Sequence, residues 1–161
     1  MQDFYIINND TIMFHRDINF KHTVIFHNND KIYIRSCVSK VINASIKTYN
    51  SNFFTKDLIK KVLCTDDKLP IVIDITNDVI IFPTHSYRNK ECVWINFSQV
   101  KYIRRAPNNH TAIYFINSKK YLINKSFYSM KNQINKCMLL RNYLLICKKK
   151  IIELNLYTKG V

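Results

Sequence analysis

The stretch IIFPTHSYRNKECVWINFSQVKYIRR, residues 80–105, is the part of the chain that decides its fold. Two apolar runs that favour β-strands are joined in it by a polar loop, Pro-Thr-His-Ser, at residues 83–86. It also carries Trp94, the single tryptophan of the 161 residues. We expect this stretch to anchor a β-rich core and to begin, at its C-terminal end, a basic surface.

The composition predicts one folded domain that spans residues 1–161. Hydrophobic residues make up 47% of the chain and aromatic residues 13%, which is too much for a disordered protein. The one glycine, Gly160, lies at the end, so the glycine-rich loops of P-loop and Rossmann proteins are excluded. Turns must therefore use asparagine and aspartate, the other residues that tolerate left-handed backbone.

The hydrophobic pattern predicts an α+β fold, in a β-rich single domain with antiparallel hairpins, a meander and a long C-terminal helix. Expected helices run from about Ser36 to Tyr49, from Thr55 onward, and from Ser126, which we expect to cap the last of them. The expected strands are residues 4–8, 11–15, 23–27, 31–35, 71–74, 79–82, 93–96, 100–105, 111–116 and 120–124.

The last helix is apolar along one stripe up to Met138 and on nearly every side beyond it. Such a helix must be buried on several sides, and in a chain of this size that predicts a homo-oligomer interface. Arg141, inside the apolar region, then needs a partner carboxylate or carbonyl, or must extend to solvent. The residues expected at the interface are Leu139, Leu140, Tyr143, Leu144 and Ile146.

Positive charge is concentrated in the second half of the chain, whose formal net charge is +14. Residues 1–84 hold ten Lys/Arg and nine Asp/Glu, a net charge of +1, whereas residues 85–161 hold fifteen Lys/Arg and two Asp/Glu, a net charge of +13. Like charges repel unless a polyanion neutralises them, so this division favours a nucleic-acid partner. An anionic membrane surface is the second interpretation.

The candidate nucleic-acid contacts form three basic groups around an expected hairpin. A hairpin with arginine at its base and asparagine at its tip can enter a minor groove, although the Asn108-Asn109 pair is equally well explained as a simple turn. Lysine and arginine at such places contact phosphates, so the affinity should fall steeply with salt. The residues are Arg88, Lys90, Lys101, Arg104, Arg105, Asn108, Asn109, Lys119, Lys120, Lys125 and Lys131.

Neither a metal site nor a cofactor is expected, and the protein is not expected to be an enzyme. The histidines at 15, 22 and 27 match no ligand spacing, and the five cysteines include no C-x-x-C pair, which suits reduced thiols. Residues 84–86, Thr-His-Ser, are expected to satisfy backbone groups in a loop. The enzyme alternative is a nuclease that uses Asp66, Asp67, Asp74 and Asp78, but no Glu is followed by a Lys two residues later.

The N-terminus lacks the basic start and apolar block of a signal peptide, and the longest apolar run, 138–147, is too short to span a bilayer. We therefore expect a cytoplasmic protein without a membrane anchor. No internal repeat or linker is visible in the sequence.

Over roughly residues 41–141 the chain resembles the ComK family of competence transcription factors. The markers are Leu-Pro-Ile at 69–71, Ile-Phe-Pro-Thr-His-Ser at 81–86 and Trp-Ile-Asn at 94–96. The segment with Ser45 and Tyr49, the turn at Asn117 and the helix start from Ser126 to Gln133 are also similar. Ile46, Asn50 and Asn117-Ser118 depart from the family pattern, which tends to have Cys, Gly and a turn glycine there.

The resemblance implies a sequence-specific DNA-binding activator of competence genes. Members of the family recognise paired A/T-rich boxes in double-stranded DNA, are thought to enter the minor groove, and act as oligomers. RNA polymerase and an adaptor with a Clp-type protease are further partners that the resemblance implies. The alternatives left open are a basic adaptor on an anionic membrane or protein surface and, behind it, the metal-dependent nuclease.

Overall fold

The fold is built around β5 (Val79–Pro83), the apolar run that opens the deciding stretch. The computed structural model describes residues 1–17 and 22–159, and it places β5 inside a six-stranded antiparallel sheet with the order β3-β2-β1-β6-β5-β4. The other strands of this sheet are β1 (Thr11–Arg16), β2 (Thr23–His27), β3 (Asp30–Ile34), β4 (Ile71–Asp74) and β6 (Val93–Asn96).

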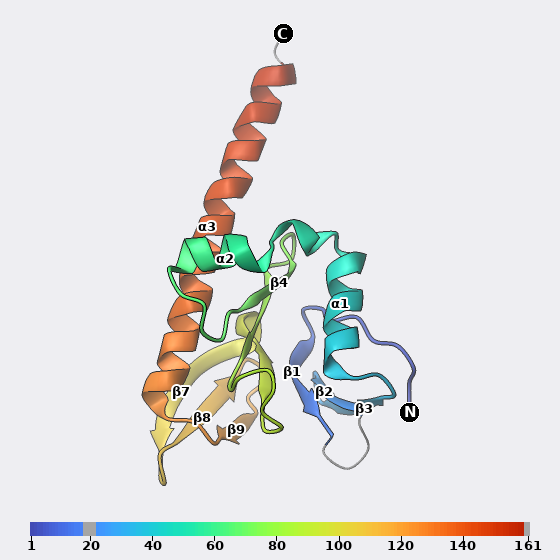
Figure 1. Ribbon diagram of the computed structural model, residues 1–161, viewed down its shortest axis with the longest axis vertical. Helices are drawn as coiled ribbons and strands as arrows, with labels where there is room; N and C mark the ends of the chain where they lie inside the picture. Colours follow the sequence, from blue (N-terminus) through green and yellow to red (C-terminus); the bar gives the residue numbers. More distant parts are fainter. Residues whose placement is uncertain (18–21, 160–161) are drawn as a thin grey trace.

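A three-stranded antiparallel meander follows at once and forms a second sheet, β7-β8-β9. Three helices and two short 3-10 turns complete the described part of the chain (Figure 1). The strands are β7 (Val100–Ala106), β8 (His110–Phe115) and β9 (Lys120–Ile123); the helices are α1 (Val38–Thr48), α2 (Lys56–Leu63) and α3 (Phe127–Lys159); the 3-10 turns are η1 (Ser51–Phe53) and η2 (Phe97–Gln99). The α+β prediction is confirmed.

Both faces of β5 are buried because a different layer covers each of them. Ile80 and Phe82 pack into a core shared with the three-stranded sheet, α2 and α3. Val79 and Ile81 face the opposite way, into a core closed by α1 and the N-terminal segment. A strand covered on both sides needs a continuous apolar run rather than an alternating one, and 79–82, VIIF, has it.

Asparagine and aspartate make the turns of this nearly glycine-free chain, as predicted. Asn28, Asp78, Asn108 and Asn109 all have left-handed backbone, with φ between 50° and 62°. These residues tolerate that conformation because their short polar side chains bond locally. Ser118, beside the predicted Asn117 turn, is also left-handed, with φ of 65°.

The strand expected at residues 4–8 does not form, and that prediction is wrong. The N-terminal segment pairs with β3 only at Gln2, and its following residues pack against α1 without regular secondary structure. Its alternating apolar side chains, Tyr5 and Ile7 among them, are instead buried in the core beside α1. The backbone N–H of Ile7 donates to Ser45 Oγ at 2.9 Å, and the buried Tyr5 hydroxyl contacts Thr11 Oγ1 at 2.7 Å.

Two of the three expected helix starts are confirmed. Thr55 caps α2 by accepting from the N–H of Leu58, and Ser126 Oγ accepts from the N–H of Ser129 at 3.2 Å. The α1 cap is Cys37 rather than Ser36, and its side chain makes no capping bond. The first turn of α1 therefore keeps the positive end of its dipole uncompensated by a side chain.

Helix α3 is fixed to the core by Gln133. This buried amide donates to the backbone oxygens of Lys68, at 2.9 Å, and Pro83, at 2.8 Å. Further along, Arg141 Nη2 reaches Asp78 Oδ2 at 2.5 Å, so the carboxylate partner expected for this arginine is present. The C-terminal part of α3 projects away from both sheets (Figure 1). Within the described residues, no helix has the length and hydropathy required to cross a membrane.

Candidate nucleic-acid interface

The hairpin of β7 and β8 is closed at its tip by three residues, Pro107, Asn108 and Asn109, because Ala106 pairs with His110. Asn108 and Asn109 have φ of 57° and 58°, and the N–H of His110 donates to the carbonyl of Pro107 at 3.2 Å. Positive φ at both central residues gives a turn whose twist matches that of the flanking strands. The backbone of the two asparagines thus forms the turn, and their exposed side chains stand at the hairpin tip.

One face of the three-stranded sheet is open and carries an aromatic pair flanked by cations. The rings of Tyr102 and Tyr114 stack across the strands, with centroids 4.5 Å apart and an interplanar angle of 22°. The Arg104 guanidinium lies 5.2 Å from the Tyr102 centroid and 5.9 Å from the Tyr114 centroid. Lys120 Nζ lies 5.7 Å from the Tyr114 centroid. We call these four residues the aromatic-cation face.

The opposite face of the same sheet is closed. Ile113, Phe115 and Ile123 are buried in the core that also holds β5 and α3. Because successive side chains of a strand point to opposite faces, the meander buries one set of side chains in the core and exposes the other set to solvent. Arg105 has different neighbours from Arg104, because its guanidinium lies 5.0 Å from the ring centroids of both Phe127 and Tyr128 at the start of α3.

The lysines predicted around the meander do not share one environment. Lys119 is half-buried and donates through Nζ to the backbone oxygen of Asn29 at 3.1 Å, so it joins the meander to the β2–β3 turn. Lys125 is half-buried near His85, whereas Lys101 and Lys131 are exposed. Only Lys120 among them belongs to the aromatic-cation face.

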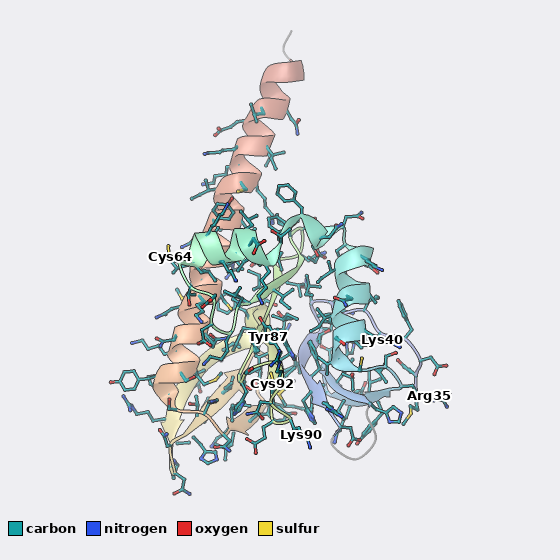
Figure 2. The ribbon with its side chains drawn as sticks, in the orientation of Figure 1. Arg35, Lys40, Cys64, Tyr87, Lys90 and Cys92 are labelled. Atoms are coloured by element: carbon teal, nitrogen blue, oxygen red, sulfur yellow. The ribbon has the colours of Figure 1, made fainter. Side chains whose placement is uncertain are left out.

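Arg88 and Lys90 lie elsewhere, in the loop between β5 and β6. Both side chains are exposed, and together with Arg16 they line a pocket beside α1. Figure 2 shows Tyr87, Lys90 and Cys92 of this loop between the strands next to α1 and the second sheet. The predicted DNA contacts are therefore divided between two parts of the surface.

The Thr84-His85 pair belongs to the scaffold. Thr84 Oγ1 accepts from the N–H of Val93 at 3.0 Å and contacts Nδ1 of the buried His85 at 2.9 Å, as expected of a loop that satisfies its own backbone. Burial lowers the pKa of the His85 ring, and nearby Lys125 lowers it further. Glu91, whose Oε2 lies 3.9 Å from His85 Nε2, acts in the opposite direction.

Two of the four aspartates considered for a nuclease are held by other partners. Asp74 accepts from the N–H groups of Thr76 and Asn77 in the β4–β5 turn, and Asp78 pairs with Arg141. In residues 1–17 and 22–159, no three His, Cys, Asp or Glu side chains are grouped so as to hold a metal ion.

Helix α3 divides the five residues predicted for an oligomer interface. Leu140 and Leu144 are buried in the chain's own core, 1% and 3% exposed, so their assignment to an interface is corrected. Tyr143 packs partly against that core. Leu139 and Ile146 are exposed, and for them an interface stays a prediction.

Sequence reasoning missed the two tyrosines of the aromatic-cation face. The signal was available, because the expected strands 100–105 and 111–116 place Arg105 opposite Thr111 and hence Tyr102 opposite Tyr114, which is the observed register. The exposed apolar residues of the projecting part of α3, Ile151, Ile152 and Leu154, were also missed.

Comparison with known proteins identifies the family. The model of the ComK protein family matches residues 2–149. The "Competence transcription factor" of Bacillus subtilis (strain 168) is 26% identical over 110 residues, which cover 68% of this chain and 57% of that protein. The chain thus spans a little over half the length of this relative, and no solved structure matches it. The match over residues 2–149 shows that the chain belongs to the ComK family.

Proposed function

We propose that this chain is a non-enzymatic transcription factor of competence genes that binds double-stranded DNA through the hairpin of β7 and β8. The observation that carries the proposal is the aromatic-cation face, on which Arg104 and Lys120 are held over the stacked rings of Tyr102 and Tyr114. No Asp or Glu occurs between Glu91 and Glu153, so the charge around this face is not compensated by neighbouring carboxylates.

Held cations suit phosphate recognition. An arginine whose plane rests on aromatic rings loses less side-chain freedom on binding than one that moves freely in solvent. Its N–H groups remain able to form paired bonds to phosphate oxygens. Lys101 and Lys120, at either side of the sheet, would extend the contact along the DNA backbone.

The hairpin tip is the part of the protein that we propose recognises the DNA sequence. Asn108 and Asn109 project past the sheet, and an asparagine amide can donate to the acceptors at the floor of an A/T-rich minor groove. A/T-rich tracts have a narrow groove with a strong negative potential, which attracts cations such as Arg104. We therefore propose paired A/T-rich boxes as the target, with the tip in the minor groove.

The test is a DNA-binding titration of the Arg104→Ala variant. We expect about a tenfold or greater loss of affinity for an A/T-box duplex, and a slope of log affinity against log salt that is shallower by about 1. Arg35→Ala is the matched control, because it removes the same charge from an exposed residue that pairs with Asp3, away from the hairpin. Equal affinities for the two variants would refute the role of the aromatic-cation face.

The same proposal includes self-association through the projecting part of α3. The stripe that is buried in the core at Cys137, Leu140 and Leu144 continues along the helix as the exposed Ile151 and Leu154. Binding to two DNA boxes on one duplex would use such a dimer, because both half-sites can then be occupied together.

A pair of lysine substitutions tests the self-association. Ile151→Lys should release monomers while the fold is kept, whereas Leu140→Lys should unfold the chain because it buries a charge. Light scattering together with circular dichroism measures both outcomes. An Ile151→Lys variant of unchanged mass would remove the helix from the proposed interface. RNA polymerase and an adaptor with a Clp-type protease are further proposed partners, from the family resemblance alone.

A further inference from the structure

A pocket of about 540 Å³ opens between the start of α1 and the loop that joins β5 to β6. Its inner surface is apolar, with Val38, Ile42, Ile71, Cys92 and Trp94 among the lining residues. Pockets of this size hold small organic ligands, and apolar walls with a few polar groups at the mouth are typical of them.

The walls suit a planar ring. Trp94 stacks with two aromatic neighbours: its ring centroid lies 6.4 Å from that of Phe14, at an interplanar angle of 8°, and 5.4 Å from that of Tyr87, at 19°. The Tyr87 hydroxyl is fixed in turn, because it donates to the carbonyl of Leu69 at 3.2 Å. A wall that is already ordered costs little further entropy when a ligand packs against it.

The mouth of the pocket is positive. Arg16, Arg88 and Lys90 line it from β1 and the loop, and no Asp or Glu is among its described lining residues. Glu91, the carboxylate of the same loop, lies near His85 instead. Three cations with no neutralising carboxylate in the lining would repel one another less if an anion were bound between them.

The first turn of α1 adds to this potential. Cys37, Val38 and Ser39 line the pocket, and neither a capping side chain nor an acidic residue compensates the positive end of the helix there. Backbone N–H groups at a helix start bind anions such as phosphate. Asn43 and Asn89, also in the lining, carry amides that can both donate to and accept from the edge of a heterocyclic base.

We propose that this pocket binds a nucleotide, with the base against the apolar wall and the phosphate among Arg16, Arg88, Lys90 and the start of α1. The shared chemistry is that of a planar base carrying a 5′-phosphate, either as a free mononucleotide or as the end of a DNA strand. The site is separate from the aromatic-cation face, so it does not depend on the proposed binding of duplex DNA. Arg88 and Lys90 then serve the pocket rather than the duplex.

Trp94 makes the test direct, because it is the single tryptophan and lines the pocket. Adenosine 5′-monophosphate is titrated into the full chain while tryptophan fluorescence is followed, and calorimetry checks the affinity. We expect a saturable change in fluorescence with this nucleotide, and binding weaker by about tenfold or more with adenosine or inorganic phosphate alone.

Substitutions locate the binding. Arg88→Ser should weaken the nucleotide by about tenfold or more. Lys40→Ser should not, since Lys40 is exposed on α1 but does not line the pocket, and lies on the outer side of the helix in Figure 2. Equal affinities for these two variants, or no saturable change with the wild-type chain, would overturn the proposal.

A 5′-phosphorylated single strand distinguishes the two sources of the nucleotide. Competition with adenosine 5′-monophosphate supports capture of a strand end, and absence of competition supports a free nucleotide. The Arg104→Ala variant separates this site from the duplex surface, because it should keep the nucleotide response whether or not duplex binding is lost. If Arg88→Ser weakened only the duplex, this loop would belong to the DNA surface and the nucleotide proposal would fail.

Discussion

The two sheets of this molecule are built from similar residues but have different surroundings. Central strands of the six-stranded sheet are covered on both faces, as the fully buried Ile81 and Phe82 of β5 show. The three-stranded sheet is covered on one face, and its other face presents Tyr102, Arg104 and Lys120 to solvent. The central strands of the first sheet serve as a scaffold, whereas the second sheet leaves one of its faces open to solvent.

The charge of the two sheets follows this difference. Strands β7 to β9 contain no Asp or Glu, although they carry four of the chain's Lys and Arg residues. Repulsion between these cations is small where solvent screens them, and cation–π contacts with the aromatic rings beneath them add a favourable interaction. The same residues in β5 would each require a buried partner, which its apolar neighbours do not provide.

The largest expected effect is that of Phe82→Ala. Phe82 is fully buried where the two sheets and α3 meet, so the cavity should lower the free energy of unfolding by about 3–5 kcal/mol. Tyr102→Ala removes a ring of similar size from the open face and should lower it by about 0.5–1.5 kcal/mol, the value of the lost stacking with Tyr114. Urea unfolding followed by circular dichroism measures both.

In DNA binding the order of the two variants should be reversed, with the larger loss of affinity for Tyr102→Ala. Tyr102→Ala removes a ring that supports Arg104 and should weaken duplex binding, whereas Phe82→Ala protein that remains folded should bind with nearly wild-type affinity. If Tyr102→Ala cost as much stability as Phe82→Ala, the meander could not be described as an open surface on a separate scaffold.

Much of this architecture could be predicted because its signals are local. The strands at 23–27, 71–74 and 93–96 have the predicted bounds, since turn residues flank short runs of β-branched and aromatic side chains. Residues 4–8 carry the same alternation, yet pack against α1 without a strand partner. Period alone cannot distinguish a strand from an irregular segment that is buried against a helix.

The parts that could not be predicted depend on contacts between distant residues. The sequence shows that α3 is apolar on many sides, but it does not show that Leu140 and Leu144 would be covered by the chain's own core. The pocket likewise brings Arg16 of β1 together with Lys90, and no sequence spacing indicates that they meet. The Tyr102–Tyr114 pair lies between these cases, because the hairpin register implied it.

The smallest expected effect lies where the two sheets meet, at His85, and depends on pH. His85 is buried after the end of β5, and both burial and Lys125, which follows β9, lower its pKa below the ordinary value. Above about pH 6.5 the ring is neutral in the folded and unfolded states, so it makes no difference to stability. As the pH falls below that value the unfolded chain takes up the proton first, and the folded state loses stability.

Comparison with His85→Gln isolates this contribution from the other titrating groups. Urea unfolding at about pH 7.5 and pH 5.5 should show a larger loss of stability on acidification for the wild-type chain than for the variant. Glu91→Gln should enlarge the wild-type loss, because Glu91 raises the pKa of the ring against the effects of burial and Lys125. If acidification lowered the stability of the wild-type chain and of His85→Gln by the same amount, then the titration of His85 would make no contribution to the pH dependence of stability.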